Sequence, residues 1–479
     1  MIQSEQQVVL GVDVGTSGVR ALAATADGQV LAEARAGLCD LPAEPPAHEQ
    51  DANAWWLTLC QTLRELRASA HAGKRWRDLR GIAVTSTSGS LVLADSRGEP
   101  VRPAMLYDDG RAAGVGTELS RRLPSGQAQL NASFSLAKAV WVRQQEPAVW
   151  ARVSYVLHPA DWLTAKLTRR WGVCDYSNAL KLGYDIERSG WNAAVEHAGL
   201  PLSMLPEVVA PGCQVGVVSA QASEETGVNA GVPVLAGASD GMASLIGSGA
   251  SAAGHANTTL GTTLVWKVLS TTKPQLGPGM YCHYHPCKLW APGAASNTGP
   301  GSLHADDSDL ADLDRLAAAE LPTSMQCYLL AGRGERFPFL NPRAEPFFDG
   351  EPRSRGMRHA AQLQSLACVE RWGYERLEAS GVAVGSQVFS AGGAASSPVL
   401  SQLRANLLNR TVARCVHPSA SFGVAILAAG TPVFGGDLTA AIRAMTRTAE
   451  SYSPQSEAAG KFEAAYQLFR AACAQHGFE

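Results

Sequence analysis

The sequence predicts an α/β protein that is divided into two large lobes. Its 479 residues exceed the ~100–200 that one domain usually holds. Strand-like and helix-like segments alternate along it, and each half contains a strand-turn-strand whose turn begins Gly-Thr. Small residues crowd positions 247–254, which favours a boundary near residue 250. We therefore expect an N-terminal lobe over 1–249 and a C-terminal lobe over 250–479.

The first lobe is predicted to open with an antiparallel meander. Residues 8–13 are apolar and β-branched, and the turn 15–18 leads into a second strand over 19–25. Asp27-Gly28 is a hairpin turn signal, and a third strand is expected over 30–34. A dinucleotide-binding domain would begin strand, helix, strand, so this opening argues against one.

A helix and two further strands are expected later in the first lobe. The helix over 51–70 repeats large apolar residues on one face, at Trp55, Leu59, Leu63 and Leu66. A strand over 81–84 enters the polar loop 85–90. The apolar strand 232–236 ends in Gly237-Ala238-Ser239-Asp240-Gly241, where a helix is expected to start.

The second lobe repeats the opening of the first. Strands over 258–260 and 264–268 flank the turn 261–263, about 245 residues after the first Gly-Thr turn, as a duplicated architecture would place it. Chance recurrence of a short turn explains the likeness equally well. At the C-terminus, a helix is predicted from residues spaced to form a packing face: Phe462, Tyr466, Phe469 and Cys473.

The two Gly-Thr turns have the residues that phosphate binding requires. Glycine allows close backbone approach, and the hydroxyl groups stand beside backbone N–H donors. The candidate phosphate-binding residues are Gly15, Thr16, Ser17, Gly261, Thr262 and Thr263.

Two aspartates follow predicted strands. Asp13 precedes the first turn, and a carboxylate there suits Mg²⁺, although it could also cap its own loop. Asp240 lies where a base could accept the proton of an alcohol during phosphoryl transfer. A helix N-cap is an equally good explanation of Asp240.

Several other functions are excluded by missing motifs. The chain has no complete Gly-x-x-x-x-Gly-Lys-Ser/Thr or Gly-x-Gly-x-x-Gly motif, and it lacks the loops of protein kinases. The run 282–287, Cys-His-Tyr-His-Pro-Cys, matches no common zinc spacing, so we expect it to be structural.

Charge and composition favour a cytoplasmic protein. The formal net charge is −3 and no basic block occurs, so we expect no nucleic-acid partner. Residues 1–7 lack the features of a signal peptide, and no apolar run approaches the ~20 residues of a membrane span. The 10 cysteines have no disulfide-type spacing.

Six segments in order along nearly the whole chain resemble the FGGY family of carbohydrate kinases. They are residues 11–20, 237–241, 260–263, 334–338, 391–402 and 425–430. The resemblance implies two lobes of the actin and ribonuclease H type with a cleft between them. It also implies transfer of the ATP γ-phosphate to a hydroxyl of a sugar or polyol.

The resemblance also implies roles for individual residues. Asp240 would be the general base, and Asp13 would hold Mg²⁺ through water. Thr16 and Thr262 would face the phosphates of ATP, and the adenine and ribose would be lined by Gly392, Gly393 and Ala394. The expected cofactors are ATP and Mg²⁺, and the expected partner is a small sugar. The oligomeric state stays open, with a homodimer as one option.

Three segments bear on the sugar. Residues 87–89 stand where xylulose kinases typically carry Gln-Met-His, and residues 107–111 resemble the family's Trp-Asn-Asp-x-Arg segment with two changes. Residues 87–89, 175–184 and 332–338 resemble the plant and cyanobacterial D-ribulose kinases. We therefore expect D-ribulose as the substrate, phosphorylated at its terminal hydroxyl to D-ribulose 5-phosphate. The expected sugar contacts are Asp13, Ser88, Asp109 and Asp240.

Three alternatives remain. The chain could be a xylulose kinase or a kinase for another pentulose or polyol. It could be a catalytically weak sugar sensor, although the first strand at Val8 leaves no room for a preceding helix-turn-helix. An actin-like ATPase is the third alternative, but such a protein needs no sugar loop.

Overall fold

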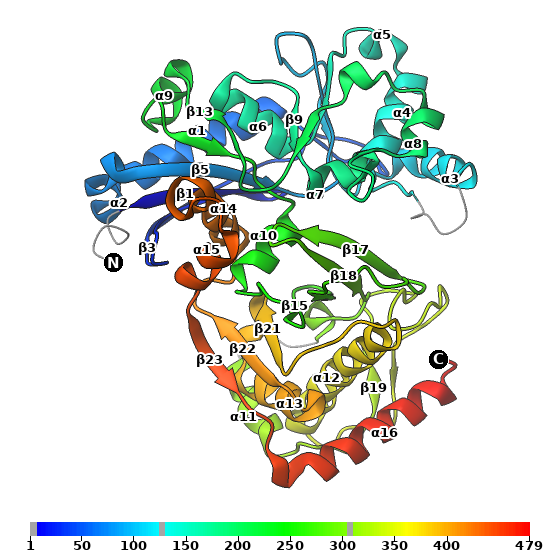
Figure 1. Ribbon diagram of the computed structural model, residues 1–479. Helices are drawn as coiled ribbons and strands as arrows, with labels where there is room; N and C mark the ends of the chain where they lie inside the picture. The colour runs from blue at the N-terminus through cyan, green and yellow to red at the C-terminus, as the bar shows by residue number, and fades with distance from the viewer. Residues whose placement is uncertain (1–6, 124–129, 304–309) are drawn as a thin grey trace. The chain divides into compact units, whose positions relative to one another are not determined.

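The computed structural model describes residues 7–123, 130–303 and 310–479 (Figure 1). The expectation that the N-terminus is not a signal peptide rests mostly on residues 1–6. These residues lie outside the described range. The described residues form two compact units. Unit 1 contains the chain up to Gly247 and also Ser419–Thr446, and unit 2 contains Ser248–Pro418 and Arg447–Glu479. The sequence prediction of 1–249 and 250–479 did not include this return of residues 419–446 to unit 1.

Unit 1 is built on a mixed sheet with the strand order β13-β14-β5-β1-β2-β3. The strands β1, β2 and β3 form the predicted antiparallel meander, whereas β5 and β14 run parallel to β1. Their bounds are β1 Val8–Gly15, β2 Gly18–Thr25, β3 Val30–Gly37, β5 Leu79–Ser86, β13 Gln214–Val217 and β14 Pro233–Leu235. Because β1, β5 and β14 are parallel, their carboxyl ends meet at one edge of the sheet.

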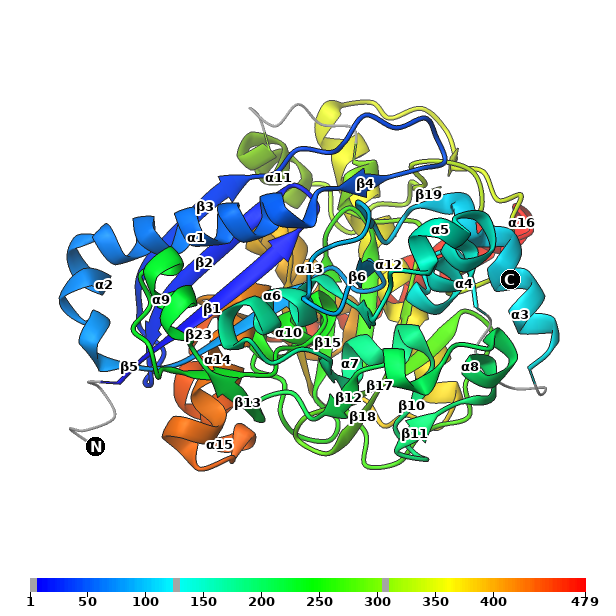
Figure 2. The ribbon, with the colours of Figure 1, turned by 90° about the horizontal axis from the view of Figure 1, so that it is seen from above.

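Helices cover both faces of this sheet (Figures 1 and 2). One face is packed by α1, Ala52–Ala68, whose four predicted apolar residues are all buried. The other face is packed by α14, Ala420–Phe434, which approaches the strands closely. A Cβ on Gly11 would lie 2.0 Å from Ser421 O, and one on Gly81 would lie 2.3 Å from Ala428 O. Glycine at these two positions is therefore what lets α14 rest directly on β1 and β5.

The remaining helices of unit 1's layers are short. They are α2 Ala70–Lys74, α6 Pro159–Thr168, α9 Ala220–Thr226, α10 Asp240–Gly247 and α15 Leu438–Met445.

A second part of unit 1 has its own apolar cluster, which includes Leu136, Val142 and Leu182. It consists of short strand pairs and helices inserted between β5 and β13. The strands are β6 Val92–Ala94, β7 Ala104–Met105, β8 Tyr155–Leu157, β9 Val173–Asp175, β10 Tyr184–Asp185, β11 Gly190–Trp191 and β12 Glu207–Val209, and β4 Glu49–Gln50 pairs with β7. The helices are α3 Ala113–Arg121, α4 Ser135–Gln145, α5 Pro147–Trp150, α7 Tyr176–Ala179 and α8 Ala193–Ala198.

Unit 2 repeats the strand arrangement of unit 1. Its sheet has the order β17-β18-β16-β15-β21-β22-β23, in which β18, β16 and β15 are antiparallel and β21 and β22 run parallel to β15. An antiparallel strand follows in each unit, β13 in unit 1 and β23 in unit 2. The duplication predicted from the two Gly-Thr turns is therefore confirmed.

The strands of unit 2 are β15 Ala256–Leu260, β16 Leu264–Val268, β17 Met280–His285, β18 Leu289–Ala295, β19 Cys327–Tyr328, β20 Phe347–Phe348, β21 Gln387–Ala391, β22 Thr411–Cys415 and β23 Thr448–Tyr452. Its helices are α11 Leu310–Ala318, α12 Arg355–Ala379, α13 Pro398–Leu408 and α16 Ala459–Gln475. The face predicted for the C-terminal helix is confirmed, because its four residues are buried in α16.

A buried ion pair lies at the centre of unit 2. Arg404 of α13 donates through Nε and Nη2 to Glu370 of α12 at 2.6 and 2.7 Å, and both side chains are 0% exposed. Glu370 also accepts from Thr258 of β15 at 2.6 Å, and Arg404 donates to Ser390 of β21 at 2.7 Å. The pair thus joins two helices to two neighbouring strands.

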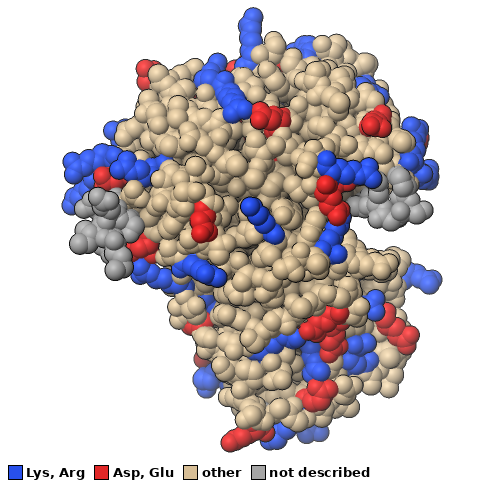
Figure 3. Space-filling view, viewed as in Figure 1, with Lys and Arg blue, Asp and Glu red and all other residues tan. Residues whose placement is uncertain are grey.

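Basic and acidic side chains are interspersed on the face in Figure 3. Across residues 7–123, 130–303 and 310–479, no individual helix is both long and apolar enough to cross a bilayer. The helices α14 and α15 meet the length and composition criteria only as a pair, and they are bent by 118° at their break.

Candidate functional site

In unit 1, three polar segments lie at the carboxyl ends of the parallel strands. β1 ends at Gly15 and is followed by Thr16 and Ser17, residues 87–89 follow β5, and residues 236–240 follow β14. Hydrogen bonds tie these ends together, since Thr87 N donates to Val14 O at 3.3 Å and Thr85 Oγ1 donates to Ala238 O at 2.5 Å. The first Gly-Thr turn, the Ser88 loop and Asp240 are therefore brought to the same edge of one sheet.

Two carboxylates interact at this edge. Burial, together with the negative charge of Asp240, raises the pKa of Asp13 to about 6, and Arg20 opposes the shift. Two acidic groups that repel each other provide the environment in which a divalent cation is stabilising. Asp13 and its surroundings thus fit the Mg²⁺ role that the sequence predicted.

Asp13→Asn is expected to make the protein more stable at neutral pH. The unfolded carboxyl titrates near 3.8 and the folded one near 6, so the folded state binds the proton more tightly. Above pH 6 the folded protein must hold an unfavourable charge, which costs roughly 1–3 kcal/mol. The melting temperature of the variant should exceed that of the wild type at pH 7, and the difference should shrink to nothing as pH falls toward 4. A difference that does not change with pH would contradict this account.

Asp240 is positioned by a turn from the second part of unit 1. The carboxylate of Asp175 accepts hydrogen bonds from Ser177 N at 2.8 Å, from Ser177 Oγ at 2.5 Å and from Asn178 N at 3.1 Å. Ser177 Oγ in turn accepts from Ser239 N at 2.9 Å, one residue before Asp240. Asp240 begins α10 and is half-buried, and its Oδ1 accepts from Gly241 N at 2.7 Å.

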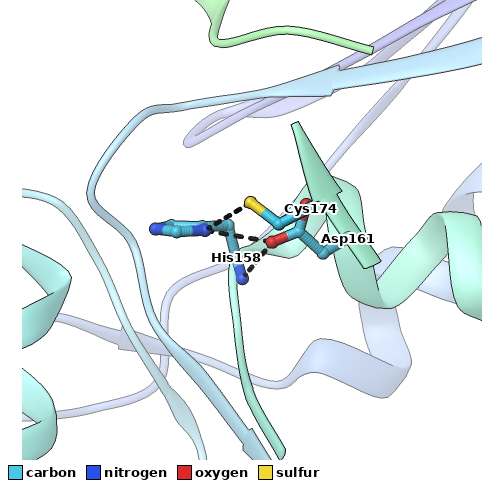
Figure 4. Close-up of side chains that lie close together, drawn as sticks. All are labelled: His158, Asp161 and Cys174. Carbon is cyan, nitrogen blue, oxygen red and sulfur yellow. Dashed lines mark hydrogen bonds and ion pairs between the residues drawn. The ribbon is translucent and has the colours of Figure 1, made fainter. Parts of the chain in front are cut away.

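Three buried side chains, His158, Asp161 and Cys174, lie close together (Figure 4), and Cys174 directly precedes Asp175 of this turn in the sequence. The ring of His158 lies between Ser135 Oγ at 2.9 Å and Asp161 Oδ2 at 3.0 Å, with Cys174 Sγ at 3.6 Å. Among the described residues this is the one group of three side chains with metal-ligand geometry. Burial raises the pKa of Cys174 well above its usual value, so the thiol stays protonated, and hydrogen bonds account for the arrangement. The cluster joins the start of α6 to β9, which ends at Asp175.

The Ser88 loop is held by a buried lysine. The ammonium of Lys138, on α4, donates to Gly89 O at 3.0 Å, Tyr107 O at 3.1 Å and Ala132 O at 2.7 Å. These three carbonyls come from three separate segments, and Lys138 is 0% exposed. Burial lowers its pKa to about 7. The hydrogen bonds of Lys138 therefore hold in place the backbone segments that carry Ser88 and Tyr107.

Asp109, which was predicted as a sugar contact, is buried within its own loop. Its carboxylate is 0% exposed and is occupied by Arg111, whose Nη2 lies 2.6 Å from Oδ2, and by His48 N at 3.0 Å. Burial raises the pKa of Asp109, but these hydrogen bonds outweigh it and hold the pKa below its usual value. The oxygens of Asp109 thus bind groups of the protein itself, and its role as a sugar contact stays a prediction. Its neighbours Tyr107 and Asp108 are exposed.

The second Gly-Thr turn joins β15 to β16 in unit 2. Thr262 is exposed, and Gly261 and Thr263 are half-buried. The glycine-rich segment Gly392-Gly393-Ala394 follows β21, the strand next to β15. Gly392 has φ +90°, and a Cβ there would lie 2.4 Å from Leu260 O. The two segments predicted to bind the nucleotide are thus neighbours at one edge of the sheet.

Glu335 supports this second turn. It is 2% exposed, and its carboxylate accepts from Ser296 Oγ at 2.6 Å, Tyr328 OH at 2.7 Å and Asn297 N at 2.7 Å. Glu335 holds residues 296–298. This segment forms backbone hydrogen bonds with Leu264, the residue immediately after the turn. The sequence analysis included Glu335 only as one residue of the segment 334–338. The positioning role of Glu335 follows from these hydrogen bonds.

The sequence analysis gave no role to Lys138, and it included Lys181 only as one residue of the segment 175–184. Each is a lone cation in an otherwise apolar or small-residue run, residues 135–142 and 179–183. A lysine in the apolar stripe of a helix is the signal that would have identified Lys138, since such a residue is rarely buried without a partner.

Family models match most of the chain. The N-terminal domain of the FGGY family of carbohydrate kinases matches residues 8–247, and its C-terminal domain matches residues 212–431. Among curated proteins, xylulose kinase of Escherichia coli (strain K12) is 27% identical over 412 residues, which are 81% of this chain and 82% of that protein.

Solved structures agree with the family match. Xylulose kinase from Rhodospirillum rubrum superposes with a TM-score of 0.86 at 28% identity, covering 98% of this chain and 99% of that one. A xyloylose kinase from Brucella ovis superposes with a TM-score of 0.88 at 25% identity, covering 99% and 100%. These structural neighbours are sugar kinases with actin-like, ribonuclease H-type lobes, so the predicted fold class is confirmed.

Proposed function

Because the chain belongs to the FGGY family of carbohydrate kinases, we propose that this sugar kinase transfers the γ-phosphate of ATP to the terminal hydroxyl of a pentulose. Kinases of this family use ATP as the phosphate donor, and an alcohol group is the acceptor. The observation that carries the proposal is the pair of interacting carboxylates, Asp13 and Asp240, beside the first Gly-Thr turn. Phosphoryl transfer requires a metal-binding group and a proton acceptor at one place.

In this proposal Asp240 accepts the proton of the attacking hydroxyl while the sugar oxygen bonds to the γ-phosphorus and ADP leaves. Asp13 would hold Mg²⁺ through water, and the ion would neutralise charge on the phosphate oxygens. The phosphates would be bound by Gly15, Thr16, Ser17, Gly261, Thr262 and Thr263, and the adenine and ribose by Gly392, Gly393 and Ala394. The raised pKa of Asp13 supports its part, because a bound cation would relieve the repulsion from Asp240.

The first candidate substrate is D-xylulose. Two curated relatives at 27% and 25% identity and one solved structure at 28% identity, each aligned over most of the chain, are named xylulose kinases. D-ribulose is the second candidate. It is favoured by the Ser88 loop and by residues 175–184 and 332–338, whose resemblance to D-ribulose kinases was noted above.

A substrate panel tests the proposal. ADP release from ATP and Mg²⁺ would be measured with D-xylulose, D-ribulose, L-xylulose, L-ribulose, ribitol and glycerol. We expect one pentulose to exceed the polyols by more than about tenfold in kcat/KM, which corresponds to about 1.4 kcal/mol of discrimination. D-xylulose as the best substrate would exclude D-ribulose specificity, and the reverse result would favour the Ser88 loop as its determinant. No acceleration by any sugar would overturn the proposed reaction.

A further inference from the structure

Lys181 lies against the Ser88 loop at the edge where Asp240 stands. It follows α7 in a single helical turn, Leu180–Leu182, and its side chain is half-buried. Its ammonium donates to Ser133 Oγ at 3.2 Å and stands 4.1 Å from the centre of the Phe134 ring. A Cβ on Gly89 would lie 3.9 Å from its Cδ. The stem of Lys181 therefore passes beside the residue that follows Ser88.

This ammonium has spare donor capacity. An ammonium offers three hydrogens, and Ser133 accepts one of them. Throughout the part of the chain that the structure describes, no carboxylate lies within 4.0 Å of Lys181. Burial lowers its pKa to about 8, and Asp240 is the charge that opposes this shift. A half-buried cation without an ion-pair partner is costly to the fold, so a ligand that accepts its hydrogens would remove that cost.

One turn fixes both Lys181 and Asp240. The carboxylate of Asp175 caps α7, which leads directly to Lys181, and the same turn holds Ser239 N through Ser177 Oγ. The distance between the two functional groups is thus set by residues within one unit. A flexible surface lysine would have no such connection to the predicted base.

We propose that Lys181 is a sugar-binding residue whose ammonium donates hydrogen bonds to an oxygen of the pentulose near the hydroxyl that faces Asp240. This inference rests on the proposed kinase function. Carbonyl and hydroxyl oxygens of a ketose are acceptors, and Lys181 supplies donors where Asp240 supplies an acceptor. The two side chains together would orient the reacting hydroxyl and hold the remainder of the sugar.

The main experiment compares Lys181→Met and Lys181→Arg with a matched control, Lys166→Met. Lys166 is another half-buried lysine of unit 1, on α6 and outside the proposed site. Its ammonium lies over the aromatic rings of Trp56 on α1 and Trp162 on α6. Loss of a charged hydrogen bond typically weakens binding by about 10- to 100-fold. Lys181→Met should raise the KM for the pentulose by that factor and leave the KM for ATP unchanged. Lys181→Arg should recover part of the loss, and Lys166→Met should alter neither KM.

The pH dependence gives a second readout. The groups facing Lys181 are Ser133, Phe134, Asp240 and the ammonium of Lys138. In the wild type kcat/KM should fall as pH rises through about 8, because a neutral amine is a weaker donor. This alkaline limb should be absent from Lys181→Met and shifted upward in Lys181→Arg.

Sugar binding without ATP, measured by calorimetry, separates the two proposals. If Lys181→Met binds the sugar at least tenfold more weakly than the wild type, the inference is supported even if the transfer assay fails. Lys181→Met with an unchanged sugar Kd and an unchanged alkaline limb would overturn it while the kinase function stands. If Lys181→Met does not fold, the same measurements on Lys181→Arg and Lys181→Gln decide. A wild type that binds no sugar and also shows no acceleration of ADP release by any sugar of the panel overturns both proposals.

Discussion

Replacement of Asp240 by asparagine is expected to lower kcat by about 10²- to 10⁴-fold, the usual contribution of a general base. The amide has nearly the same shape and can still accept from Gly241 N, so the start of α10 is retained. The variant loses the ability to take up a proton, and it also loses the negative charge that acts on Asp13 and Lys181. ADP release under saturating ATP and sugar measures kcat, and calorimetry measures the sugar Kd, which should change by less than about threefold.

The control for this change is Asp95→Asn. Asp95 caps the turn 95–98 through its side chain, and asparagine is equally suited to such a turn. It lies outside the proposed site, so this variant should retain wild-type kcat. If Asp240→Asn instead loses sugar binding while transfer continues at a measurable rate, Asp240 is a binding residue and another group is the base.

The largest effect on stability is expected at the buried ion pair of unit 2. Glu370→Leu would leave the guanidinium of Arg404 at 0% exposure without its carboxylate partner. Breaking one side of such a pair typically costs about 3–5 kcal/mol. Thr258 Oγ1 would lose an acceptor as well. Urea denaturation monitored by circular dichroism should give a midpoint well below that of the wild type.

Two comparisons make the test specific. The double variant Glu370→Leu/Arg404→Met removes both charges and should recover much of the lost stability, because no unpaired charge remains. Glu118→Leu breaks the ion pair with Arg122 on α3, whose side chains are 56% and 53% exposed, and should cost less than about 1 kcal/mol. Equal losses from Glu370→Leu and from the double variant would show that packing, and not the unpaired charge, dominates at this position.

Local patterns predicted the strands that frame the site. The meander β1–β3, the strand-turn-strand β15–β16 and the buried faces of α1 and α16 follow from alternation and helical spacing, which act over a few residues. The Gly-Thr turns were recognisable for the same reason, since glycine and hydroxyl residues must be adjacent in sequence to form one loop.

Such local patterns could not predict contacts between segments that are far apart in the sequence. The three carbonyls that Lys138 binds come from residues 89, 107 and 132, and no spacing rule joins them. The hydrogen bonds of Asp109 could not be predicted either, because a carboxylate next to a sugar-type loop has the same local pattern whether it faces a ligand or binds Arg111 of its own loop. Only the fold distinguishes the two cases.

The return of α14 to unit 1 has a consequence for the order in which the chain can fold during synthesis. The helix packs on β1 and β5, yet about 410 residues separate Gly11 from the part of α14 that covers it, and a ribosome adds about 5–20 residues each second. One face of the first sheet therefore stays uncovered for tens of seconds while unit 2 is being translated. A nascent chain that stops near residue 250 should bind chaperones and be cut readily by proteases. A linked fragment of residues 7–247 and 419–446 contains the missing helix and should resist cleavage.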